Sequence, residues 1–351
     1  MAGRVLVTGI SGFIGSHVAL ALLYAGYQVR GSLRDMGRAA EVAGMLERAG
    51  ADLSRLEFVP LDLMDDHGWR EAMDGVRYLQ HVASPLTVRM PENRDELIRP
   101  AVEGTRRAIA AALGAQVERI VLTSSAAAIA YGHPAEKTAF TEADWSATTG
   151  DDVNAYTESK TRAELEAWSL MEAAGRREAL ATINPVVVLG PLLGGDHGVS
   201  ALLVKRLLEG VPFAPRTSLE LIDVRDVASL HVNAMTHPMA AGRRHLAAGG
   251  SVRFLDFARD LAVAYPDFAR RLPRHEVPDA LVRLYALFNR DAQAAIRNLG
   301  RTRHFDAAAG EALLGRPFIT PRIAAAATAR SLIDLGLVHP PSPRNGSEKK
   351  G

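Results

Sequence analysis

A tyrosine and a lysine are the residues of this sequence whose types and spacing best suit acid–base chemistry. Tyr156 and Lys160 occur in "YTESK", and only five lysines stand among the 41 basic residues. On the helix predicted over 155–174, a spacing of four places both side chains on one face. An ammonium group beside a tyrosine favours the phenolate and is expected to lower the tyrosine's pKa, which brings a general acid closer to neutral pH. A contact on a helix surface is the alternative interpretation.

Two hydroxyl groups, Ser124 and Ser125, end the apolar strand predicted at "RIVLTSS". In an open parallel sheet, ligands bind outside the carboxyl ends of the strands, which is where these hydroxyls are expected. A serine at such a place also serves as a simple cap or turn residue. The combination with Tyr156 and Lys160 is more specific than any of its parts.

The glycine-rich stretch "VTGISGFIG" places Gly9, Gly12 and Gly15 between the first predicted strand and the first predicted helix. Such a turn lets a pyrophosphate approach bare backbone N–H groups at a helix N-terminus, where the helix dipole favours anions. A tight turn that binds nothing is the alternative. We interpret the stretch as a dinucleotide site.

The end of the second strand, "VRGSLRD", indicates which dinucleotide is preferred. NAD sites usually present a carboxylate to the ribose there, whereas Arg34 can bind a 2′-phosphate through two hydrogen bonds. Asp35 either pairs with Arg34 or turns toward the ribose, and a solvated surface arginine is a further alternative. NADPH/NADP⁺ is therefore the predicted cofactor.

Strands that are almost wholly apolar alternate with helices through the first half of the chain. This pattern predicts an α/β fold, a Rossmann doubly wound parallel sheet with a smaller C-terminal substrate-binding lobe. The predicted strands are 4–9, 27–33, 56–62, 78–84, 119–125 and 180–190, and a strand followed by a helix is expected over 219–228. We assign 1–190 to the NADP-binding domain with 217–248 returning to it, 191–216 and 249–339 to the lobe, and 340–351 to a disordered tail.

Composition limits the classes of function. A formal charge of +1 with interspersed acidic and basic residues disfavours nucleic acid as a partner, and no segment is apolar for long enough to span a membrane. The chain has no cysteine, which excludes thiolate metal sites and is compatible with the cytoplasm. No metal is expected: His81 is interpreted as structural and His197 as a loop residue. A monomer or homodimer is expected.

The motifs together resemble those of the extended short-chain dehydrogenase/reductases. Within them, "VTGISGFIGSHV", "VRGSLRD", "HVASP", "VLTSSA", "YTESK" and "INPVVVLGP" are similar to the group of dihydroflavonol reductases, cinnamoyl-CoA reductases and microbial aldehyde and methylglyoxal reductases. The resemblance covers about residues 4–270. It implies that Ser125 holds a carbonyl oxygen, that Tyr156 donates the proton, and that Lys160 binds the nicotinamide ribose.

The resemblance also implies a set of cofactor-binding residues beyond the glycine turn. Asp62 and Leu63 would flank the adenine, and 185–188 would line the nicotinamide. The implied set is Gly9, Gly12, Phe13, Ile14, Gly15, Arg34, Asp62, Leu63, Val82, Ala83, Ser84, Thr123, Tyr156, Lys160, Pro185 and Val188.

Three departures from the group narrow the substrate. Ala130 replaces the asparagine that dihydroflavonol reductases present to polyphenol hydroxyls, which disfavours flavonoids. "VNAYTESK" replaces the "NWYCYGK" of cinnamoyl-CoA reductases, which disfavours CoA thioesters. Ala101 stands where many relatives carry the asparagine of a proton relay, so a relay here would use Lys160, ribose and water.

The function predicted from these residues is NADPH-dependent reduction of uncharged aldehydes or ketones to alcohols. The expected pocket segments 84–88, 126–130 and 187–193 contain no charged residue, and a charged substrate would lose its hydration there without a partner. Oxidation of a hydroxysteroid or another secondary alcohol by the same residues is the main alternative. A nucleotide-sugar epimerase or dehydratase, or a non-catalytic dinucleotide sensor, is less favoured.

Overall fold

The computed structural model of the chain describes residues 3–85, 91–195, 198–287, 299 and 301–341. His197, the end of the expected pocket segment 84–88 and the tail from residue 342 onward lie outside the described residues.

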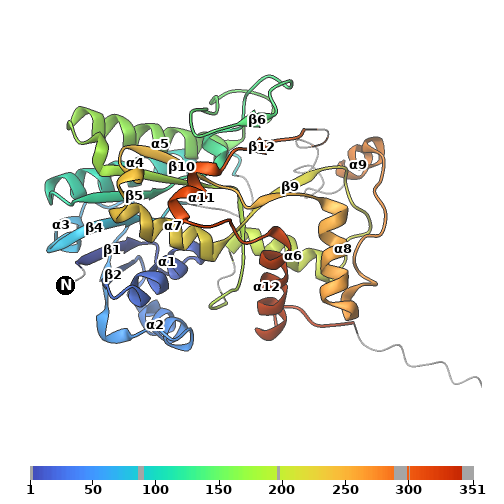
Figure 1. Cartoon of the computed structure of the whole chain (residues 1–351), viewed down its shortest axis with the longest axis horizontal. Helices are drawn as coiled ribbons and strands as arrows, with labels where there is room; N and C mark the ends of the chain where they lie inside the picture. Colours follow the sequence, from blue (N-terminus) through green and yellow to red (C-terminus); the bar gives the residue numbers. More distant parts are fainter. Residues whose placement is uncertain (1–2, 86–90, 196–197, 288–298, 300, 342–351) are drawn as a thin grey trace, which may run out of the picture.

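A seven-stranded sheet forms the centre of the molecule, with the strand order β10-β7-β5-β4-β1-β2-β3 (Figure 1). All neighbouring strands run parallel. The strands are β1 Arg4–Thr8, β2 Gln28–Leu33, β3 Leu56–Pro60, β4 Val76–His81, β5 Arg119–Thr123, β7 Leu180–Pro185 and β10 Arg243–Ala247. The chain order reverses between β1 and β4, and this is the point at which such sheets bind ligands.

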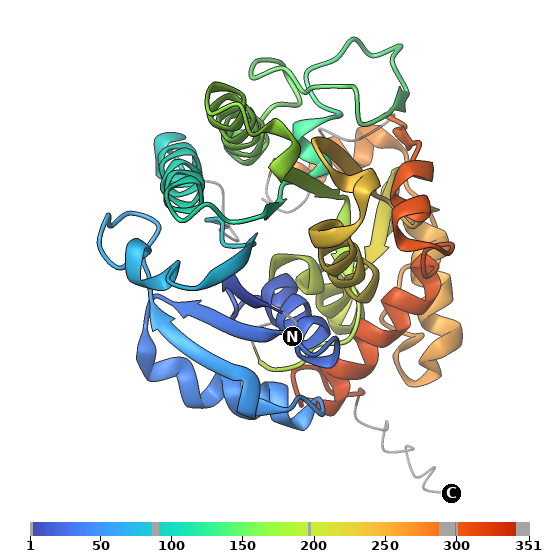
Figure 2. The same ribbon diagram turned by 60° about the vertical axis from the view of Figure 1, so that its left-hand side comes forward.

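Helices cover both faces of this sheet, as predicted for a doubly wound fold (Figures 1 and 2). On β1, Val5 and Val7 face the apolar core on one side of the sheet, whereas Leu6 between them faces the core on the other side. This alternation is the period of a strand that is buried on both sides. The covering helices are α1 Phe13–Tyr24, α2 Ala39–Arg48, α3 Trp69–Ala72, α4 Asp95–Gly114, α5 Ala155–Ala173, α7 Val224–Thr236 and α11 Ala308–Leu314.

The single strand predicted over 180–190 is wrong, because the segment contributes to two sheets. β7 ends at Pro185, and β8 Val187–Leu189 then joins β9 Ser218–Asp223 and β11 Gly250–Arg253 in a three-stranded sheet. Between them, the N–H of Val186 donates to the carbonyl of Ala247 at 3.1 Å, which places the break at the edge of the main sheet. The strand predicted within 219–228 is present as β9, and it belongs to this second sheet.

A separate apolar core surrounds the second sheet. It joins Leu189 and Leu221 of the sheet to side chains of three helices. These helices are α6 Gly198–Glu209, α8 Phe254–Ala264 and α12 Pro321–Asp334, and α9 Asp279–Ala286 lies at the same end of the molecule (Figure 1). A short parallel pair, β6 Ala139–Phe140 and β12 His304–Phe305, completes the strands.

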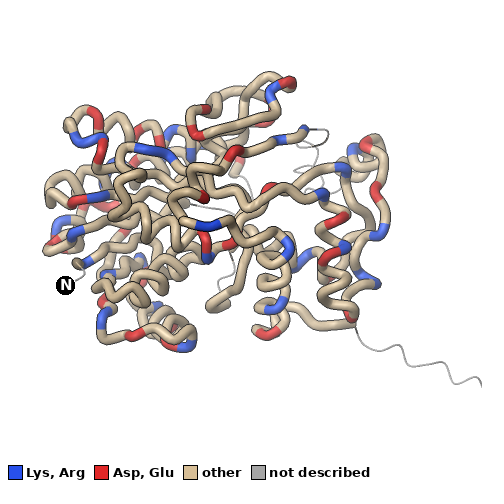
Figure 3. Tube along the Cα trace, in the orientation of Figure 1, with Lys and Arg blue, Asp and Glu red and all other residues tan. Residues whose placement is uncertain are grey.

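Acidic and basic residues alternate along the described chain, and neither sign dominates one region (Figure 3). Within the described ranges, every helix is too short or too polar to cross a lipid bilayer.

Candidate active site

The glycine turn joins β1 to α1 at the reversal of strand order. Gly9 has φ +70°, a left-handed conformation that costs glycine little. A Cβ on Gly15 would lie 2.0 Å from the carbonyl oxygen of Gly9, so only glycine permits this packing of helix on turn. The helix begins after Gly12 without a side-chain cap. Its first N–H groups are therefore available to an anion.

The segment after β4 lies directly beside this turn. A Cβ on Gly9 would lie 2.9 Å from the Cα of Ala83. The hydroxyl of Thr8 accepts hydrogen bonds from the N–H groups of Val82 and Ala83, both at 3.1 Å. With both lone pairs engaged, Thr8 donates its proton to Nδ1 of His81 at 2.9 Å. These contacts fix Val82 and Ala83 against the turn.

The end of β2 offers a cation and no free carboxylate. Arg34 follows the strand, its side chain is exposed, and no hydrogen bond or ion pair ties it to another described residue. Asp35 does not pair with Arg34, because its Oδ1 accepts the N–H of Gly37 at 2.9 Å and caps the next turn. Of the interpretations that the sequence leaves open for Asp35, the structure shows this local cap.

The structure brings Ser125 and Tyr156 together at the carboxyl ends of the central strands. Tyr156 Oη donates to Ser125 Oγ at 3.4 Å, although 31 positions separate them in the chain. Asn154 caps α5 by accepting the N–H of Thr157 at 2.9 Å, which fixes where the helix begins. Two hydroxyl oxygens at this separation can both contact one oxygen atom of a ligand.

Lys160 is buried one helical turn after Tyr156, with 8% of its surface exposed. Burial lowers the pKa of Lys160 to about 8, and the carboxylate of Glu164 acts in the opposite direction. His81 lies close enough for the Lys160 charge to contribute to its low pKa of about 3, which burial chiefly causes. The lysine is thus a buried ammonium that interacts electrostatically with a carboxylate and with a neutral imidazole.

The expected lowering of the tyrosine's pKa by Lys160 is not found. Burial raises the pKa of Tyr156 above its ordinary value, Ser125 partly offsets this by its hydrogen bond, and Tyr131 raises it further. Removing a phenolate from water costs more than one hydroxyl contact returns. Tyr156 therefore keeps its proton at neutral pH.

The remaining residues of the predicted cofactor set are distributed over several elements. Asp62 and Leu63 follow β3, where Asp62 Oδ1 accepts the N–H of Met64 at 2.8 Å and Leu63 packs on Gly104 of α4. Thr123 ends β5 and contacts His231 Nε2 at 3.0 Å. Pro185 ends β7 and Val188 is buried in β8. Phe13 and Ile14 begin α1 and are partly buried.

Two residues near Ser125 were missed in the sequence. Glu164 continues the spacing of Tyr156 and Lys160 by another four positions, so helical periodicity alone would have found it. Arg244, which lies 80 positions further along the chain, pairs with Glu164. No pattern in the sequence predicts this pair. Among the described residues, no group of three or more potential metal ligands gathers in space.

A doubly wound sheet that brings a serine and the tyrosine of a Tyr-x-x-x-Lys helix together at the strand ends is the arrangement of extended short-chain dehydrogenases/reductases, a class of oxidoreductases. The family model "NAD dependent epimerase/dehydratase family" matches residues 5–249, and the chain belongs to this family. The resemblance found in the sequence motifs is thereby confirmed.

Curated relatives and solved structures agree with this membership. "Cinnamoyl-CoA reductase CAD2" of Medicago truncatula is 33% identical over 270 residues, 75% of this chain and 81% of the relative. "Ketoreductase azaE" of Aspergillus niger is 30% identical over 338 residues, 89% of this chain and 97% of the relative. The crystal structure of "yeast methylglyoxal/isovaleraldehyde reductase Gre2 complexed with NADPH" has a TM-score of 0.78, 26% identity, and coverage of 95% of this chain and 100% of that one.

Proposed function

We propose that the protein reduces uncharged aldehydes or ketones to alcohols with NADPH and that Tyr156 donates the proton. The observation that carries the proposal is the 3.4 Å contact between Tyr156 Oη and Ser125 Oγ. It lies on the edge of the sheet that bears the glycine turn. The ketoreductase and the yeast NADPH-bound reductase support the same class of reaction.

Each side chain has a separate task in this mechanism. The two hydroxyls hold the carbonyl oxygen and stabilise the negative charge that develops on it. NADPH, when bound, would supply the hydride. Tyr156 gives its proton to the oxygen, and the raised pKa means that the proton is present when it is needed. Lys160 binds the nicotinamide ribose and places an ammonium near the tyrosine.

The residues present fit NADPH at the glycine turn. The uncapped N-terminus of α1 receives the pyrophosphate, and Gly9, Gly12 and Gly15 permit its approach. The free guanidinium of Arg34 receives the 2′-phosphate. As the family resemblance implies, Asp62 and Leu63 would contact the adenine and Pro185 and Val188 would line the nicotinamide. Val82, Ala83, Ser84 and Thr123 would complete the cofactor site at the carboxyl ends of β4 and β5.

Replacing Arg34 with alanine should weaken NADPH binding about 10-fold or more, since a charge-assisted hydrogen bond is worth roughly 1.5 to 3 kcal/mol. NADH lacks the 2′-phosphate, so its dissociation constant should change little. Fluorescence titration with both cofactors measures this, and Arg48→Ala, an exposed arginine of α2, is the control. An equal loss for both cofactors, or a wild type that prefers NADH, would contradict the assignment.

The surroundings of the site favour an uncharged substrate. Residues 126–130 are buried and apolar, and Val188 of β8 is buried as well. Arg216, a charge that could otherwise reach the substrate, pairs with Asp279 at 3.1 Å. Burial raises the pKa of Glu220, which favours its neutral form. We assign substrate binding to 191–216 and 249–339, the segments that build the second core.

A substrate panel tests this specificity. Aryl and medium-chain aldehydes and ketones should be reduced with a higher kcat/KM than phosphorylated, CoA-linked or sugar-nucleotide carbonyls, because each buried methylene contributes about 0.8 kcal/mol of transfer free energy. Consumption of NADPH and formation of the alcohol are both measured. A clear preference for a sugar nucleotide would make the protein an epimerase-like or dehydratase-like enzyme, and a preference for a CoA thioester would reverse the interpretation of "VNAYTESK".

A further inference from the structure

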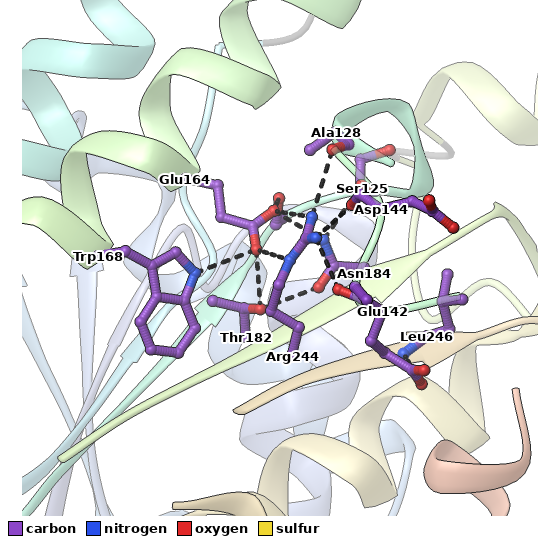
Figure 4. Close-up of polar contacts among 12 residues, drawn as sticks. Ser125, Ala128, Glu142, Asp144, Glu164, Trp168, Thr182, Asn184, Arg244 and Leu246 are labelled. Carbon is purple, nitrogen blue, oxygen red and sulfur yellow. Dashed lines mark hydrogen bonds and ion pairs between the residues drawn. The ribbon is translucent and has the colours of Figure 1, made fainter. Parts of the chain in front are cut away.

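A buried ion pair lies directly behind the serine of the site. Glu164 and Arg244 meet at 2.7 Å, and their side chains are 0% and 8% exposed. Figure 4 shows the carboxylate and the guanidinium facing each other beside Ser125 and Asn184. Replacing such a pair with apolar residues is often neutral or stabilising in proteins. Stability alone therefore gives a weak reason for its presence here.

The carboxylate of Glu164 collects donors from several elements. Oε2 accepts from Ser124 Oγ and from Asn184 Nδ2, the latter at 2.7 Å. Oε1 accepts from Arg244 Nε at 2.7 Å, Thr182 Oγ1 at 3.0 Å and Trp168 Nε1 at 3.3 Å. The side chain thus ties α5, which carries Tyr156 and Lys160, to the ends of β5 and β7.

Two of these links lead to the turn that holds Ser125. Ser124 is its direct neighbour, and Asn184 also donates to the Ser125 carbonyl at 3.3 Å. Arg244 reaches the other end of the turn, where it donates to the carbonyl of Ala128 at 3.3 Å. Ser125 Oγ itself accepts the N–H of Ala127 at 3.1 Å. The turn is therefore held at both ends by one ion pair.

The guanidinium of Arg244 is fixed in turn by its own surroundings. It lies 3.7 Å from the ring centre of Trp145. It donates to the carbonyls of Glu142 at 2.8 Å and Asp144 at 2.5 Å. These contacts leave the arginine little freedom to move without releasing the turn.

We propose that Glu164, held by Arg244, is a positioning residue that keeps Ser125 in register with Tyr156 and that sustains the ammonium of Lys160. The proposal rests on the proposed function, because it takes the roles of those three residues from it. Glu164 reaches Ser125 through Ser124 and Asn184. It reaches Lys160 through space from the next turn of the same helix.

The electrostatic part of the proposal has a definite sign. Burial lowers the pKa of Lys160 and Glu164 raises it, while His81, which faces Lys160 from β4, stays neutral above pH about 3. Removing the charge of Glu164 must lower the pKa of Lys160 further. The ammonium is then lost at a lower pH, and NADPH binding, which depends on it, weakens at a lower pH.

The test compares Glu164→Gln with Glu166→Gln, the same change two positions along α5 at an exposed pair with Arg106. Glu164→Gln should lower kcat about 10- to 100-fold, since small misplacements of reacting groups have effects of this size, with less than about a 3-fold change in the NADPH dissociation constant at pH 7. The pH at which NADPH binding weakens, measured by fluorescence titration, should move to lower values. Glu166→Gln should change neither quantity.

Ser124→Ala provides a second and milder variant, because it removes one link and leaves the ion pair in place. It should lower kcat about 3- to 10-fold while the pH dependence of NADPH binding stays that of the wild type. The proposal would be overturned if Ser124→Ala kept the kcat of the wild type. It would also be overturned if Glu164→Gln left the pH dependence of NADPH binding unchanged. Failure of the proposed function looks different, since the wild type would then reduce no carbonyl, or Tyr156→Phe would remain active.

Discussion

Tyr156→Phe is expected to lower the rate of carbonyl reduction by a factor on the order of 10² to 10⁴, because it removes the proton donor and one of the two hydroxyls that hold the carbonyl oxygen. The side chain keeps its shape, and among the described residues the hydroxyl that is lost makes the single long contact of 3.4 Å with Ser125. Folding and NADPH affinity should therefore stay close to the wild type. Single-turnover reduction with excess enzyme measures the chemical step directly.

Tyr131→Phe is the matched control for that variant. Tyr131 interacts electrostatically with Tyr156, so we choose it as the candidate for an alternative donor. We expect this control to keep most of its activity. If Tyr156→Phe kept more than about a tenth of the wild-type rate, Tyr156 would not be the acid. An inactive Tyr131→Phe would instead indicate that Tyr131 takes part in the reaction.

Lys160→Met should abolish most activity without weakening the fold. Methionine has nearly the length of lysine and fills the buried site, but it contributes no charge and no hydrogen bond to a ribose. We expect a loss on the order of 10²-fold or more in kcat/KM. Lys160→Arg should also lose most of its activity, because a planar guanidinium cannot replace a compact ammonium.

The expected stability of Lys160→Met follows from the lowered pKa. The folded protein holds Lys160 at about 8 against an ordinary 10.5, so burying the charged lysine opposes folding at neutral pH. This cost is fully present below pH about 8. It disappears as the pH rises to 10.5, the ordinary pKa that the lysine has in the unfolded chain. In denaturant titrations without cofactor, the free energy of unfolding of the variant should equal or exceed that of the wild type. The gain should be at most about 3 kcal/mol.

Lys205→Met is the control for the lysine variant, because Lys205 pairs with Glu209 on the surface of α6. It should retain activity. Near-normal kinetics in Lys160→Met would contradict the role of Lys160, and a large loss of stability would show that the ammonium is a structural group.

Local patterns predicted the main sheet and the meeting of Ser125 with Tyr156. The apolar strands, the glycine turn and the four-residue spacing of Tyr156 and Lys160 each depend on neighbours in the sequence, and the parallel fold then requires Ser125 to lie at the same edge. The prediction of one continuous strand over 180–190 was wrong because the residues of β7 and of β8 are equally apolar, so the pattern does not mark the break between them. Only the contact of Val186 with Ala247 shows where the chain changes sheet.

Quantities that depend on three-dimensional surroundings were not predictable. The direction of the Tyr156 pKa shift follows from burial, which the spacing of a tyrosine and a lysine does not reveal. The pairing of Glu164 with Arg244 joins residues from two elements 80 positions apart. Neither residue is unusual in a chain with 40 acidic and 41 basic residues, so composition gave no reason to select them.

The most direct test of the account follows the hydride and the proton donor in one experiment. Wild type and Tyr156→Phe are mixed with an uncharged aryl ketone and NADPH that carries deuterium at both C4 positions of the nicotinamide, and the products are analysed by mass spectrometry. The account predicts that the wild type forms an alcohol with one deuterium on the former carbonyl carbon, one molecule for each NADPH consumed, and that the variant forms almost none. An alcohol without deuterium, no reduction of any carbonyl in the panel by the wild type, or equal yields from the two proteins would contradict it.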